Sequence, residues 1–116
     1  MIRAALDQVL TVLDDAGIAA TIDARNLSAP GCFVTVTKVS DLALDGSAKV
    51  TGDIVAVVRD LGGAADIDNL SALLDDVVEP LKAANVEITD IITNEQATPP
   101  SGGTLPAARL TYTLYI

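Results

Sequence analysis

The side chains best suited to catalysis are few in this sequence, and their spacing matches no known catalytic pattern. Cys32 is the only cysteine, and the chain has no histidine, which is the usual general base and a common metal ligand. Ser47 or Ser71 could pair with Lys49 or Lys82, but no spacing singles out such a pair. We therefore expect Cys32 to be a passive strand residue and the protein not to be an enzyme.

Carboxylates are more numerous, and three short acidic clusters are candidate cation sites. Asp66 and Asp68 have part of the spacing of a calcium loop, but its central glycine and its closing glutamate are absent. We expect Asp66 or Asp68 to accept hydrogen bonds from free N–H groups of the first turn of a helix. Asp14-Asp15 and Asp75-Asp76 lie on predicted helices, where adjacent side chains point about 100° apart. The sequence therefore predicts no metal site and no cofactor.

Gly62 and Gly63 stand between a predicted strand and a predicted helix, where a glycine-rich turn can bind phosphate. The lysine and the serine or threonine of a phosphate loop are missing, and Asp66 would repel an anion there. We interpret the two glycines as a tight turn.

The composition predicts one domain, residues 1–116, with an aliphatic core, because half of the residues are hydrophobic and only 3% are aromatic. No stretch approaches the about 20 apolar residues of a membrane span, and the first ten residues lack the apolar core of a signal peptide. The net charge is −9, and the seven basic residues lie at least ten positions apart. This distribution argues against a surface that grips nucleic acid.

Two stretches have the spacing of amphipathic helices. The segment Met1–Ala16 is the first, and Gly17 is suited to end it. In the second, Asp66–Asn85, apolar residues recur every three or four positions: Ile67, Leu70, Leu74, Val77 and Leu81. Pro80 lacks an N–H group and clashes with the carbonyl four residues earlier, so we expect a kink or a break near Asp76–Glu79.

Five stretches are predicted to be strands: Ile18–Ile22, Cys32–Val39, Ala48–Arg59, Val86–Thr93 and Ala108–Ile116. The second and third flank a turn at Asp41–Ser47 and are well placed for an antiparallel hairpin. The polar stretch Asn94–Pro106 is predicted to be a thirteen-residue loop. Connections of that length are usually functional or mobile.

This order of elements predicts an α+β two-layer sandwich, in which a mixed or antiparallel sheet of four or five strands carries two helices on one face. The other face of the sheet is rich in Thr and Val, and it is either solvated or a contact surface. Val55 and Val57 lie on that face, opposite Ile54 and Val58. We therefore consider both valines candidates for a subunit contact.

The element order also resembles a known family. A loop at Asn26–Gly31 opens onto the strand Cys32–Val39; a long strand, the helix Ile67–Ala84, the stretch Val86–Ile92, a Pro/Gly loop and a closing strand Leu105–Ile116 follow. This order is similar to that of the tail terminator proteins of long-tailed bacteriophages, the lambda-like minor tail protein U group, especially those of actinobacteriophages. The resemblance covers nearly the whole chain and rests on length, element order and loop placement, not on a motif.

The resemblance implies a structural virion protein without a catalytic site. Such proteins form homohexameric rings that cap the tail tube protein, end tube growth and face the head–tail stopper and neck proteins. The implied location is the head-proximal end of the tail in the virion, and the host cytoplasm during assembly. DNA would only pass through the lumen, and no membrane is involved. The candidate assembly residues are then Val55 and Val57 together with the loop residues Thr98, Pro99, Pro100, Ser101, Gly102 and Gly103.

The acidic balance has two interpretations. A hexamer would carry a charge of about −54, and such a field lining a lumen would repel passing DNA. The same charge also serves plain solubility. Two alternatives to the terminator function remain open: a head–tail stopper or other neck protein, and a small bacterial ligand-binding α+β domain. The latter would need a pocket with convergent polar groups.

Overall fold

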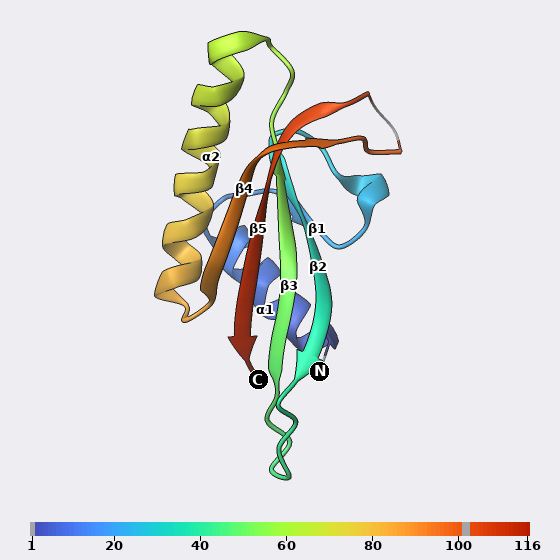
Figure 1. Ribbon diagram of the computed structural model, residues 1–116, viewed down its shortest axis with the longest axis vertical. Coiled ribbons are helices and arrows are strands. Elements are labelled where there is room, and N and C mark those ends of the chain that lie inside the picture. Colours follow the sequence, from blue (N-terminus) through green and yellow to red (C-terminus); the bar gives the residue numbers. More distant parts are fainter. Residues whose placement is uncertain (1, 101–102) are drawn as a thin grey trace.

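The computed structural model describes residues 2–100 and 103–116 and confirms the predicted α+β architecture (Figure 1). The elements in chain order are α1 (Ile2–Asp15), β1 (Ala20–Thr21), the 3₁₀ helix η1 (Ala24–Asn26), β2 (Gly31–Ser40), β3 (Lys49–Val57), α2 (Gly63–Ala83), β4 (Glu87–Ala97) and β5 (Leu105–Tyr115). The five strands form one sheet in the order β1-β2-β3-β5-β4. Only the β1–β2 pair is parallel, so the sheet is mixed.

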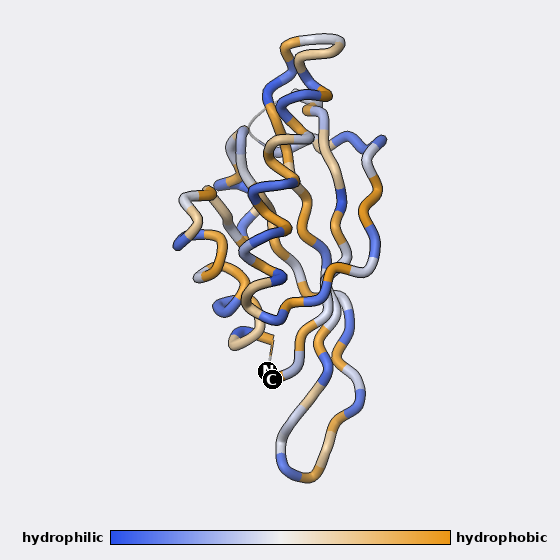
Figure 2. Tube along the Cα trace, turned by 90° about the vertical axis from the view of Figure 1, so that its left-hand side faces the viewer, coloured by the Kyte–Doolittle hydropathy of each residue, from blue (hydrophilic) through white to orange (hydrophobic). Residues whose placement is uncertain are grey.

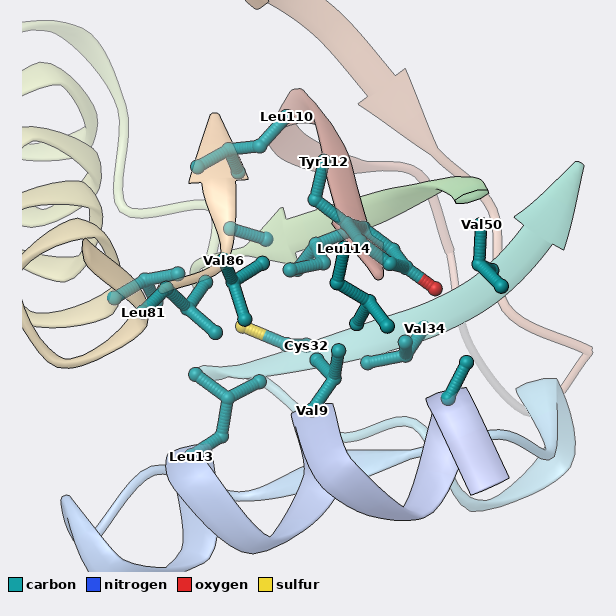
Figure 3. Packing of buried hydrophobic residues seen from close by; sticks show 14 residues of the cluster. Val9, Leu13, Cys32, Val34, Val50, Leu81, Val86, Leu110, Tyr112 and Leu114 are labelled. Atoms are coloured by element: carbon teal, nitrogen blue, oxygen red, sulfur yellow. The ribbon is translucent and has the colours of Figure 1, made fainter. Parts of the chain in front are cut away.

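Both helices lie on the same side of the sheet, as predicted. Figure 1 looks onto the open face of the sheet, with α1 behind it and α2 along the β4 side, and Figure 2 shows the layers from the side. The core fills the space between the two layers (Figure 3). It consists of Ala5, Val9, Leu13, Cys32, Val34, Val50, Ile54, Ala56, Val77, Leu81, Val86, Leu110, Tyr112 and Leu114. No helix among the described residues is long and apolar enough to cross a membrane.

Helix α1 follows the prediction closely. Ala5, Val9 and Leu13 recur every four residues and are fully buried, and each of the larger two contributes about 1.5–3 kcal/mol through burial. Gly17 has φ +79°, the left-handed conformation that ends many helices. The N–H of Ile18 then bonds to the carbonyl of Leu13. Gly17 therefore turns the chain back toward the sheet.

Helix α2 begins at Gly63, three residues before the predicted start. Asp66 accepts hydrogen bonds from the N–H groups of Leu61 and Gly62 at 2.8 and 3.1 Å. Both donors precede the helix, so Asp66 fixes the turn before α2 and does not bond the first-turn N–H groups as expected. Ile67 was expected on the buried stripe but is 70% exposed, because the stripe facing the sheet begins only at Leu70. The first turn of α2 therefore extends beyond the region that the sheet covers.

Of the kink or break expected near Asp76–Glu79, the break is wrong, since α2 continues through Pro80 to Ala83. Because Pro80 has no N–H group, the backbone carbonyl of Asp76 has no donor four residues later in the helix. Asp76 is exposed, so water can bond to this carbonyl instead. Val77 and Leu81, on either side of Pro80, are both fully buried against the sheet. Their packing holds the last turn in place despite one missing backbone hydrogen bond.

The predicted hairpin of β2 and β3 is confirmed, but the predicted thirteen-residue loop is wrong. β4 continues to Ala97 and β5 begins at Leu105, so the connection spans only 98–104. Glu95, Gln96 and Ala97 pair with β5 beyond a register shift. These residues are polar or small and lie outside the core, so their pairing depends on backbone hydrogen bonds that hydrophobic periodicity does not indicate.

Tyr112 is the largest fully buried side chain among the described residues, and it crosses the sheet on the side of the helices (Figure 3). Its hydroxyl donates a 2.8 Å hydrogen bond to the carbonyl oxygen of Thr35 on β2. The ring passes over Gly52 on β3, where an added Cβ would overlap the Thr35 carbonyl and lie 2.6 Å from the Tyr112 hydroxyl oxygen. Tyr112 and Gly52 together tie β5, β3 and β2 into one unit.

Replacing Gly52 with alanine is expected to lower the free energy of unfolding by about 1–3 kcal/mol, because the new methyl group must displace the Tyr112 ring. Gly103→Ala is the matched control, since nothing lies within 4 Å of a Cβ at that position. Urea denaturation followed by circular dichroism measures both variants. A Gly52→Ala protein as stable as the parent would show that Tyr112 is not held against β3.

Candidate assembly surfaces

The open face of the sheet carries a mixture of apolar and polar side chains. Val55 and Phe33 are half-buried neighbours on adjacent strands. Arg109, opposite Val55 on β5, lies 3.6 Å from a carboxylate oxygen of Asp53 through Nη1. The Thr111 hydroxyl donates to the same carboxylate at 3.3 Å. Because the Arg109 side chain is 45% exposed, this ion pair contributes at most about 1 kcal/mol to the free energy of unfolding. The open face of the sheet remains available for contact.

The two valines proposed as contact residues differ in the structure. Both lie on the face opposite Ile54, as their alternation predicts, but only Val55 is partly exposed. Val57 is fully buried. It pairs with Gly31 and Ala107 at the end of the sheet from which the β4–β5 connection extends (Figure 1). The expectation that Val57 is exposed is therefore wrong.

The loop proposed as a contact site is smaller than expected. Thr98 and Thr104 lie within hydrogen-bond distance through their hydroxyl oxygens, 3.2 Å apart, and close the connection. Pro99 is buried, whereas Pro100 and Gly103 are exposed. Ser101 and Gly102 lie outside the described residues. Among the described residues of this connection, Thr98, Pro100, Gly103 and Thr104 are exposed, and Pro99 packs against the rest of the protein.

A second projecting segment was not predicted as a contact site. The turn between β2 and β3, residues 41–48, extends beyond the rest of the molecule at one end of its long axis (Figures 1 and 2). Two leucines in it are exposed, Leu42 at 65% and Leu44 completely. Asp45 accepts hydrogen bonds from the N–H and hydroxyl of Ser47 at 2.9 and 2.7 Å, which shape the turn. Apolar residues in an otherwise polar turn were the sequence signal for this site.

The sheet has two open edges. β4 ends the sheet on one side, and Ile91 and Ile92 on it are 42% and 49% exposed. On the other side β1 pairs only with Cys32 and Phe33, so the rest of β2 ends the sheet there. Long open edges promote association between chains. Sequence reasoning missed them, because which strand lies at an edge depends on strand order.

The negative charge is concentrated on the helices. α1 and α2 carry eight acidic and two basic residues, a net charge of −6 out of the −9 of the whole chain. The sheet and loops carry the remaining −3. A lumen lined by the open face of the sheet would therefore be far less acidic than the overall composition suggests.

Two findings bear on the groups considered for chemistry. Cys32 is fully buried in the core, and burial raises the pKa of its thiol to about 12, which keeps it unreactive (Figure 3). No group of three or more potential metal ligands occurs within the described part of the chain.

No family model matches the chain, and no curated protein matches it.

Stability is expected to fall as the pH rises from about 9 to about 12. Burial raises the pKa of Cys32 from 9.0 to about 12, and burial with a smaller contribution from the Asp53 charge raises that of Tyr112 from 10.0 to about 12. Both groups ionise at lower pH in the unfolded chain than in the folded protein. Their contribution to the free energy of unfolding is therefore fully present below the unfolded-state pKa and is lost as the pH rises to the folded-state pKa.

Urea midpoints measured across this pH range test the expectation. Cys32→Ala should be less stable at every pH because of the cavity, but its stability should fall less steeply, by up to about 1.4 kcal/mol per pH unit. An unchanged slope would contradict the assignment of the pH dependence to Cys32.

Proposed function

We propose that the protein is a tail terminator subunit of a long-tailed bacteriophage. It forms a homohexameric ring at the head-proximal end of the tail, caps the tail tube protein and joins it to the head–tail stopper of the neck. The observation that carries the proposal is the projecting turn 41–48, which places two exposed leucines at one end of an elongated molecule. Exposed apolar residues grouped on one projecting turn are typical of a surface that contacts another protein, which docking onto a tube end would require.

The arrangement of the other surfaces supports the same proposal. The open edges of the sheet face sideways, and the β4–β5 connection lies toward the end opposite to the turn 41–48 (Figure 1). In a ring whose axis runs along the strands, the edges would meet neighbouring subunits. The two connections would then point to opposite faces of the ring, one toward the tube and one toward the neck. Val55 and the exposed part of the β4–β5 connection remain proposed contact residues.

Electron microscopy of negatively stained protein, alone and mixed with purified tail tube protein, tests the proposal. We expect six-fold rings, or tubes that end in a distinct cap. Failure of the protein to form rings and to decorate tube ends would overturn the terminator function. Binding to neck proteins without capping of tubes would instead favour the head–tail stopper.

A pair of leucine variants tests the role of the turn 41–48. Replacing Leu42 and Leu44 by serine should change stability by no more than about 0.5 kcal/mol, because both are exposed, but should abolish tube capping. Leu61→Ser is the matched control, since Leu61 is 65% exposed but lies just before α2. Unimpaired capping by the double variant, measured by counting capped tubes, would show that the turn does not contact the tube.

One groove favours the alternative of a small ligand-binding domain. It has a volume of about 570 Å³ and lies between α2, the end of β3 and the segment after α1. Arg59, Asn69 and Asp76 are polar residues on its wall, and Val58 and Leu73 are apolar ones. A metabolite that raises the melting temperature by several degrees, and loses this effect in Arg59→Ala, would support that function instead.

A further inference from the structure

We propose that one copy of this chain pairs through the open edge of β4 with the open edge of β2 of a second copy, in antiparallel orientation. Because it specifies how the subunits of the ring would join, this inference rests on the proposed function. The interface would consist of residues 87–91 of one copy and residues 34–38 of the next.

The two open segments lie at the same level of the sheet. Across the sheet, Lys38 on β2 pairs with Thr51 on β3, which pairs with Thr113 on β5, which pairs with Glu87 on β4. Four residues further along, the same succession runs from Val34 through Ile54 and Leu110 to Ile91. A neighbour related by rotation about an axis along the strands would therefore bring the two segments together without any shift along that axis.

The two segments also match at both ends, and between these ends Thr35 lies level with Asp90 and Val36 with Ile88. Each strand contains one register shift, between Val36 and Lys38 in β2 and between Ile88 and Asp90 in β4. The shifts compensate, so both segments have five residues over the same height. Lys38 and Glu87 then lie opposite each other on the open face, and Val34 and Ile91 on the helix-facing side.

Strand directions fit as well. β2 and β3, β3 and β5, and β5 and β4 are each antiparallel, so β4 runs opposite to β2. Pairing of β4 with a neighbour's β2 continues this alternation around the assembly. The contact joins two different edges, so it is head-to-tail and closes into a ring where the rotation permits.

Charge favours this pairing over two of the possible two-fold pairings. Two antiparallel β4 edges in the register that sets Glu87 opposite Asp90 would bring acidic residues together, and two β2 edges centred on position 38 would set Lys38 opposite Lys38. Like charges directly opposite each other destabilise a strand pair. Three ion pairs form among the described residues, and Lys38 and Glu87 belong to none of them. The β4–β2 contact places these two opposite charges together.

The structure leaves space for such a neighbour beside β4. A groove of about 550 Å³ runs between the β4 edge and the last turns of α2. Its walls include Val78, Val86, Ile88 and Ile91. The helix layer of the next copy, which begins behind its β2, would lie over this groove and cover the exposed flank of Ile91.

Cysteine cross-linking tests the pairing in the free protein. In the Lys38→Cys/Glu87→Cys variant, oxidation of concentrated protein should produce a ladder of covalent oligomers on a denaturing gel. The native Cys32 is buried and does not interfere. Lys38→Cys/Ser71→Cys is the matched control, because Ser71 is exposed on α2, away from both edges. A ladder as strong in the control, or no ladder in the test variant, would overturn the pairing.

A charge exchange gives a second readout by sedimentation velocity. Lys38→Glu and Glu87→Lys should each weaken self-association on the order of fivefold, and the variant with both changes should recover it. Failure of the double exchange to recover association would also overturn the pairing.

The outcomes separate this inference from the proposed function. Six-fold rings without cross-linking would leave the terminator function standing and place the ring contact elsewhere. A cross-linked ladder that grows into open polymers, and never caps tubes, would support the pairing and contradict the terminator function.

Discussion

The contact of Tyr112 with Gly52 and Thr35 is the constraint on which the rest of the sheet depends. The chain has only three aromatic residues, and this is the one that is fully buried. Its ring needs the space that a side chain on β3 would occupy, so position 52 must be glycine. Its hydroxyl in turn satisfies a carbonyl on β2, close to the register shift of that strand. The aliphatic side chains of α1 and α2 then pack on a sheet whose central strands are already joined.

The buried half of the molecule was largely predictable from the sequence. The four-residue spacing of Ala5, Val9 and Leu13 predicts a helix with one buried face. The alternation of apolar and polar residues in β2 and β3 predicts strands with one buried face. Prediction failed where burial depends on tertiary structure. Ile67 continues the helical pattern, but it lines an open pocket shared with residues of β4 and β5 and stays exposed. Val57 faces the open side, but neighbouring segments bury it.

The candidate site was less predictable, because it consists of edges and ends. The polar residues 95–97 form a strand only because β5 lies beside them, so no local pattern marks them. The match between residues 34–38 and 87–91 arises from two register shifts in strands that are not neighbours. Neither strand order nor register shifts can be inferred from hydrophobic periodicity alone. Leu42 and Leu44 were visible in the sequence, but a turn assignment directs attention to polar residues and glycines.

The concentration of acidic residues on α1 and α2 has a consequence for how ionic strength would act on an assembly. In a ring, the helix layers of neighbours lie side by side with −6 on each copy, so they repel. The edges beneath them attract through Lys38 and Glu87. Salt screens both interactions at the distances involved, since the Debye length is about 8 Å at physiological ionic strength. The repulsion is spread over more charges, so its loss outweighs the loss of one ion pair. Association would then strengthen as salt is added, the opposite of a complex held together by surface charge.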